Sequence, residues 1–127
     1  MSFTNAFETT VLQFALTTTS VTRPTNWYIA LFTSDPTETG AAGTEVTGGS
    51  YARTAVTFSV SGNLGTNSAA VEFPACTADW GTITHLGVMD ASSSGNMLVH
   101  AALTTSKVIA VGDVFRIPTG DLDITLD

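Results

Sequence analysis

The sequence is poor in basic residues. Lysine and arginine number four against eleven aspartate and glutamate residues, which gives a formal net charge of -7. An acidic surface repels phosphate, so this composition disfavours direct binding to nucleic acid. Charged residues of either sign make up 12% of the chain, about half of their share in an average soluble domain. Much of the surface is therefore expected to consist of uncharged, hydroxyl-bearing side chains, as suits a protein that packs into an assembly.

Cysteine is also nearly absent. Cys76 is the single cysteine, which excludes an intrachain disulfide and a thiolate-rich metal cluster. No histidine or other base lies beside it in the sequence, so we expect a small packed residue rather than a nucleophile.

Motifs for catalysis and metal binding are missing. The sequence contains no nucleophile elbow, no P-loop and no dinucleotide-binding fingerprint. His85 and His100 are the only histidines and lack the spacing of a zinc site. The C-terminal aspartates do not follow the EF-hand pattern. We therefore predict no catalytic residue, no metal site and no cofactor. An enzyme acting on cell-wall sugars is the one alternative left open, because paired acids meet in space rather than along the chain.

Long apolar runs are absent too. Apolar residues make up 43% of the 127 residues, enough for a folded core, but none of their runs approaches the roughly 20 residues of a membrane span. The first residues lack the basic and apolar regions of a signal peptide. We expect one soluble domain over residues 1–127, synthesised in a cytoplasm.

Near the N-terminus, apolar residues repeat at three- and four-residue spacing, which predicts an amphipathic helix over residues 3–17. This stripe consists of Phe3, Phe7, Val11 and Phe14. Glu8 follows Asn5 by three residues and indicates a capping box, with Ser2 or Thr4 as alternative caps. The stripe carries more aromatic bulk than the edge of a small sandwich needs, so we expect the helix to dock onto a partner.

From residue 26 onward the pattern changes to short strands separated by turns. The expected strands are 27–32, 51–60, 69–74, 82–89, 97–103, 107–111, 114–117 and 122–126. About eight strands predict a mainly β fold, an antiparallel β-sandwich or small barrel preceded by one N-terminal helix. The helical segment is placed at 1–20 and the sandwich at 26–127. The first strand is nearly all apolar, so we expect it to be central and buried on both faces.

Two connections stand out between these strands. Residues 33–49 are rich in glycine and poor in apolar side chains, which indicates a long surface loop. Residues 92–96 form a tight polar connection, and 61–67 are expected to be a turn. A loop as long as 33–49 in a small domain is usually functional or mobile.

Four segments carry a resemblance to a known family. They are NWYIALFTSDP at 26–36, GGSYAR at 48–53, TADWGTITH at 77–85 and GDLDITL at 120–126. In this order they resemble small virion structural proteins of tailed bacteriophages, described as tail-fibre-like and comparable with outer capsid (cement) proteins. The resemblance implies a non-enzymatic structural protein of the virion that is synthesised in the host bacterial cytoplasm.

Two functions follow from this resemblance. The first is an outer capsid decoration (cement) protein, a homo-oligomer with a trimer as first expectation, which binds the major capsid protein on the outer surface of the virion and stabilises the shell. The alternative is a tail or tail-fibre component that binds the host surface through loops 33–49 and 92–96, since loops on a rigid sandwich are natural recognition surfaces. For both functions we expect other virion proteins as partners. We expect no binding to nucleic acid or to a membrane.

Seven residues are the predicted contacts with these partners. They are Phe3, Phe7, Val11, Phe14, Asp35, Pro36 and Trp80. The first four form the helix stripe, and the next two begin the long loop. Trp80 stands beside a predicted turn, so we expect it to be partly exposed, as aromatic anchors of interfaces commonly are.

Overall fold

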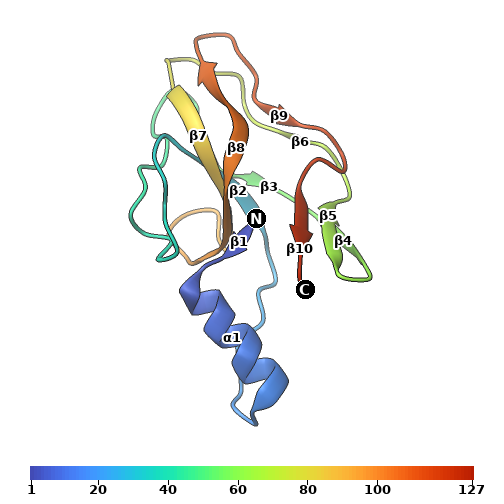
Figure 1. The fold of residues 1–127 in the computed structure, drawn as a ribbon. Helices are drawn as coiled ribbons and strands as arrows, with labels where there is room; N and C mark the ends of the chain where they lie inside the picture. The colour runs from blue at the N-terminus through green and yellow to red at the C-terminus, as the bar shows by residue number, and fades with distance from the viewer.

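A five-stranded antiparallel sheet forms the centre of the computed structural model, which describes residues 1–127 (Figure 1). Its strands, in spatial order, are β1 (Ser2–Phe3), β8 (Met97–Ile109), β7 (Gly81–Met89), β2 (Tyr28–Phe32) and β3 (Thr54–Ala55). A second sheet has the order β10 (Asp123–Thr125), β5 (Leu64–Asn67) and β4 (Phe58–Ser61). The third pairs β6 (Val71–Glu72) with β9 (Arg116–Ile117). The predicted mainly β, antiparallel fold is confirmed, and no sheet closes into a barrel.

The main core lies on one face of the large sheet, where the two smaller sheets cover it (Figure 1). Ile29 and Leu31 of β2 and Ile83 of β7 are fully buried there, against side chains such as Val71 and Ile117 from the smallest sheet. Alternation along β2 sends Ala30 and Phe32 to the opposite face, where they pack with Met89 and Met97. The apolar run of β2 is therefore buried on both faces, as predicted.

Strands β7 and β8 form the longest ladder of the fold. Strand β7 was predicted almost to the residue, but β8 is one continuous strand of 13 residues instead of two. The pairing shifts register between Ile83 and His85, so the polar stretch around Thr104–Ser106 is accommodated without ending the strand. Threonine is a good strand former, and Thr104, Thr105 and Ser106 are all exposed to solvent. These polar residues therefore form an exposed section of one strand and not a turn between two strands.

The prediction of one continuous strand over 51–60 is wrong. It divides into β3 of the large sheet and β4 of the second sheet, with Val56 buried at the crossing. The amide of Val56 donates to the carbonyl of Trp27, and the carbonyl of Thr57 accepts from Ser68. The chain thus changes sheets at this point. The predicted turn 61–67 is correspondingly too long, since only Gly62, at φ +60°, and Asn63 turn the chain before β5 begins.

One helix, α1 (Asn5–Leu16), follows the short strand β1 and begins two residues later than predicted. Phe3 is not helical but pairs with Val99 as part of β1. The cap residue is Thr4, and its hydroxyl donates to the carbonyl of Met97 (2.8 Å) instead of to the helix. The capping box proposed for Asn5 and Glu8 is therefore not formed. Residues 1–4 anchor the helix start to the sheet.

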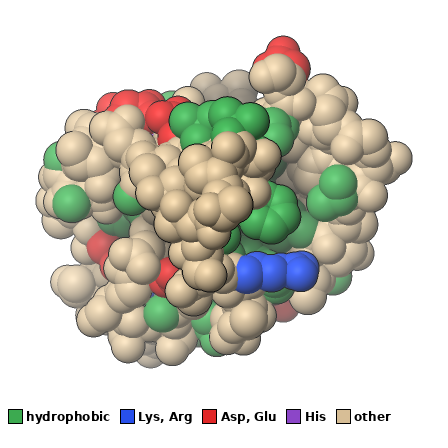
Figure 2. Space-filling view, turned by 90° about the horizontal axis from the view of Figure 1, so that it is seen from below, with side chains coloured by type: hydrophobic (Ala, Val, Ile, Leu, Met, Phe, Trp, Pro, Cys, Tyr) green, Lys and Arg blue, Asp and Glu red, His purple; other side chains and the backbone are tan.

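Beyond this anchor the helix leaves the body of the protein (Figure 1). No residue of α1 is buried. Seen from the helix end, hydrophobic side chains gather on this face of the molecule around a hollow (Figure 2). The helix is too short to cross a membrane.

Candidate functional site

The long loop 33–49 is held against the large sheet along much of its length. Its two ends join, because the amide of Thr33 donates to the carbonyl of Thr44 (2.9 Å) and the amide of Val46 to the carbonyl of Leu31 (3.0 Å). Two of its own side chains, Pro36 and Val46, are buried. The loop is thus an ordered surface feature rather than a loose connection.

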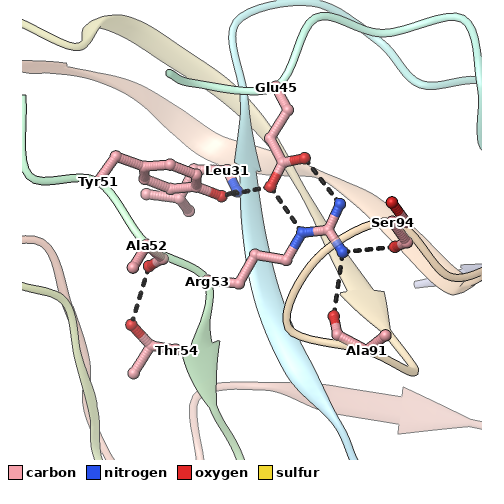
Figure 3. Close-up of polar contacts among 8 residues, drawn as sticks. All are labelled: Leu31, Glu45, Tyr51, Ala52, Arg53, Thr54, Ala91 and Ser94. Carbon is pink, nitrogen blue, oxygen red and sulfur yellow. Dashed lines mark hydrogen bonds and ion pairs between the residues drawn. The ribbon is translucent and has the colours of Figure 1, made fainter. Parts of the chain in front are cut away.

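Arg53 joins this loop to the connection 90–96 (Figure 3). Its guanidinium makes two parallel bonds to the carboxylate of Glu45, Nε to Oε1 and Nη2 to Oε2, both 2.8 Å long. Its Nη1 donates to the carbonyls of Ala91 (3.0 Å) and Ser94 (2.7 Å). Only 9% of the Arg53 side chain is exposed, against 25% for Glu45. One largely buried cation therefore fixes two loops that are distant in sequence. We call the exposed residues of 33–49 and 90–96 the joined-loop surface.

Tyr51 extends this network to the sheet (Figure 3). Its hydroxyl donates to Glu45 Oε1 (2.8 Å) and accepts the amide proton of Leu31 (3.0 Å). Burial raises the pKa of Tyr51 strongly, and the neighbouring carboxylate adds to this rise. Burial also acts to raise the pKa of Glu45, but the hydrogen bonds from Arg53 and Tyr51 and the charge of Arg53 outweigh it, so this pKa lies below its ordinary value. The bond to Glu45 raises the pKa of Arg53. The network is therefore charged at neutral pH.

The shorter loop is braced at its base by its own ends. Asp90 accepts hydrogen bonds from the backbone amide (2.7 Å) and the side-chain amide (3.1 Å) of Asn96. Between them, Ser94 and Gly95 both take positive φ angles, which turn the chain sharply. Ser92, Ser93 and Ser94 remain exposed at the tip. This loop therefore presents hydroxyl groups from a fixed backbone.

The low pKa of Glu45 leads to a prediction about pH. Its carboxylate stabilises the fold fully above its unfolded pKa of 4.5, and this contribution disappears as pH falls through the lower folded pKa. We expect Glu45→Gln to be less stable than the wild type at pH 7 by about 1–3 kcal/mol, and this difference to shrink steadily below about pH 4.5. Urea unfolding of both proteins between pH 7 and pH 3 measures it. An unchanged difference at pH 3 would contradict the charged network.

Two histidines lie beside acidic side chains of the same loop. His85 Nε2 lies 3.8 Å from Asp35 Oδ1, and His100 Nε2 lies 3.3 Å from Glu38 Oε1. His85 also shares a hydrogen bond with the hydroxyl of Thr84 (2.8 Å). No group of three or more histidine, cysteine, aspartate or glutamate side chains is placed to hold a metal ion. Each imidazole therefore lies close to a carboxylate of the loop.

The seven predicted interface residues do not form one surface. Phe3 and Phe7 are half-buried and pack edge to face with ring centroids 5.1 Å apart. Val11 is also half-buried, whereas 76% of Phe14 is exposed. Asp35 is exposed in the loop, and Pro36 beside it is buried. Phe14 and Asp35 are thus the exposed members of this set, and the role of all seven residues in contacts stays a prediction.

The expected exposure of Trp80 is wrong. Only 4% of this residue is accessible. Its ring packs edge-on against Tyr51, with centroids 5.5 Å apart, and its Nε1 donates to the carbonyl of Gly49 (2.9 Å). A Cβ on Gly49 would lie 2.8 Å from that nitrogen, so glycine is required for the close approach. Trp80 is a core residue. Cys76 is also buried, as expected, and its thiol donates to the carbonyl of Ala78.

Sequence reasoning missed the central role of Arg53. Arg53 lies within the predicted strand 51–60 and Glu45 within the predicted loop 33–49, and the sequence does not pair them. A usable signal was present, because an arginine that becomes buried within a strand needs an acidic partner. The sequence contains no information on which of eleven acids it is.

Comparison with known proteins bears on the chain as a whole. Curated proteins gave no match. A family model described as podophage GP4 fiber I protein gp80 matches residues 2–125. This match covers nearly the whole chain and agrees with the resemblance to small virion structural proteins of phages. The chain belongs to the podophage GP4 fiber I protein gp80 family, a family of phage fibre proteins.

Proposed function

We propose that this chain is a non-enzymatic component of a phage tail fibre and that it contacts the host surface through the joined-loop surface. The family description carries the fibre assignment. The observation that carries the site is the Arg53 network, which fixes two exposed loops side by side on the large sheet.

The physical argument for this surface is preorganisation. Binding through loops costs conformational entropy unless the loops are ordered beforehand. Here a bidentate arginine pair, two further bonds to loop carbonyls and the braced end of 90–96 order them in the free protein. The exposed side chains are mostly hydroxyls, among them Thr37, Thr39, Ser92 and Ser93. Such groups suit a hydroxyl-bearing ligand, and cell-surface polysaccharide is the ligand class that we propose.

The capsid cement reading, our first expectation from the sequence, has less support. Beyond the resemblance, it rests on the acidic balance, the low charge and the lack of a catalytic pattern, none of which distinguishes a capsid protein from a fibre protein. The family is described by a fibre protein and not by a capsid protein. We therefore favour the fibre reading, with other virion proteins as the partners that hold the chain on the particle.

Particles made without this protein distinguish the two readings. A fibre component that binds the host is required for adsorption and leaves the shell unaffected, so we expect adsorption to be lost and capsid heat resistance to be unchanged. A cement protein stabilises the assembled shell by binding to it, so its removal lowers heat resistance and spares adsorption. Retained adsorption, with or without a weaker shell, would overturn the fibre proposal.

A further inference from the structure

A hollow of about 520 Å³ lies between α1, residues 20–25 and the connection 90–96. Met97 and Leu98, the first residues of β8, also line it, and both are buried. Its volume lies within the roughly 300–1,000 Å³ of sites that bind small molecules. Asn96 is exposed and belongs both to this hollow and to the joined-loop surface. The hollow therefore extends the surface that we propose for host contact.

The hollow contains a cation and a carboxylate that do not pair. Arg23 and Asp90 both line it, but no ion pair joins them, and Arg23 takes part in no other ion pair. Asp90 is fixed in place, because each of its two oxygens accepts a hydrogen bond from Asn96. Each oxygen keeps a further lone pair. A hydroxyl group fits between such a cation and carboxylate, because it accepts a hydrogen bond from a guanidinium and donates one to a carboxylate.

The remaining polar lining consists of uncharged side chains. They are Thr10, Gln13, Ser20, Thr22, Thr25 and Asn96. The side-chain amide of Asn96 donates one of its two protons to Asp90, which leaves one donor and its carbonyl oxygen for a ligand. Apolar groups of Phe7, Val21 and Pro24 lie among these polar ones. A sugar ring has the matching chemistry, because its edge carries hydroxyls and its faces carry C–H groups.

Charge selects the kind of sugar. The chain has a net charge of -7, so it repels a polyanion over most of its surface. Within the hollow, the opposite charges of Arg23 and Asp90 balance each other. A neutral sugar therefore enters without this repulsion, whereas a chain of acidic sugars does not.

We propose that the hollow binds a neutral sugar unit of the cell-surface polysaccharide, with one sugar hydroxyl between Arg23 and Asp90 and the ring beside Phe7. This inference rests on the proposed function for the class of ligand, and it adds a site that lies outside the loop tips. One polysaccharide chain can occupy the hollow and also touch the joined-loop surface, since the two meet at Asn96. Two linked contacts of this kind bind more tightly than either contact alone.

Two-dimensional amide NMR of the full chain tests the proposal. The probes are glucose, galactose, mannose, rhamnose and N-acetylglucosamine, each titrated alone, and protein-free polysaccharide isolated from the surface of host cells. Glycerol at the same concentrations controls for solvent effects. We expect at least one of the sugars, and the polysaccharide, to shift the amides of residues 20–25 and 96–98 until the site is saturated.

Arg23→Ala should weaken this binding by at least about tenfold, because it removes a hydrogen bond between a charged group and the sugar. Arg116→Ala is the matched control, since Arg116 is also exposed, carries the same charge and lies outside the hollow. It should bind the sugar like the wild type. The amide spectra show at the same time that both variants are folded.

Three results would overturn the proposal. The first is the absence of saturable shifts at residues 20–25 and 96–98 with every probe. The second is equal binding by Arg23→Ala and Arg116→Ala. The third is a polysaccharide that shifts only amides at the tips of the two loops, which would leave the host contact of the joined-loop surface standing. Conversely, sugar binding in the hollow together with normal adsorption of particles altered at the loop tips would contradict the joined-loop contact alone, so the two proposals fail separately.

Discussion

Arg53→Ala is expected to destabilise the protein by roughly 3–5 kcal/mol and to free both loops of the joined-loop surface. The substitution leaves the largely buried carboxylate of Glu45 without its cation, and it leaves the carbonyls of Ala91 and Ser94 without their donor. An unpaired buried charge costs more than the ion pair contributes. Urea unfolding measures the stability, and protection of the loop amides from hydrogen exchange measures their order.

Arg23→Ala is the matched control for this prediction, because Arg23 is exposed. It should change stability by less than about 0.5 kcal/mol. Arg53→Lys should recover only part of the loss, since an ammonium group cannot make the two parallel bonds to Glu45. Equal stability of Arg53→Ala and Arg23→Ala would show that the network does not hold the loops.

Ile29→Ala or Leu31→Ala should each cost about 2–5 kcal/mol of stability. Both side chains are fully buried in the main core, where the large sheet faces the two smaller sheets. Asp123→Asn, at an exposed position of β10, should cost little. Thermal or urea unfolding of the three variants compares them. Equal shifts for all three would mean that the inside and outside of these strands are wrongly assigned.

The elements that sequence reasoning predicted well are those with a strong local signal. Strand β2 is a short, aromatic-rich apolar run, which favours a strand buried on both faces. The spacing of Phe7 and Val11 was enough to predict the helix. The helix was predicted to begin two residues too early, because the apolar Phe3 fits the helical stripe as well as it fits the edge of a sheet.

The elements predicted poorly depend on contacts between distant segments. Alternation over residues 51–60 is the same whether the chain stays in one sheet or changes sheets at Val56. The burial of Trp80 depends on the approach of Gly49, which lies 31 residues earlier in the chain. The Arg53 network joins residues 8 to 41 positions apart. No local sequence pattern encodes such partners. The sequence therefore predicted two surface loops, but not that Arg53 joins them.

The association of the two loops with the host remains the central claim. The stability predictions do not test this claim, because a correctly folded fibre component can contact other virion proteins alone. Substitutions at the loop tips separate these cases, because Thr39 and Ser93 are exposed and their side chains take no part in the Arg53 network. A bulky side chain there should obstruct a ligand and leave the fold intact.

The most direct measurement is the adsorption rate of phage particles that carry Thr39→Tyr or Ser93→Tyr, compared with particles that carry Ser59→Tyr. Ser59 is exposed on β4, in the second sheet, away from both loops (Figure 1). We expect adsorption to fall by at least about tenfold for the two loop variants, a loss typical of an obstructed contact at the centre of an interface, and to be unchanged for Ser59→Tyr. Wild-type adsorption by both loop variants would contradict the assignment of host contact to this surface.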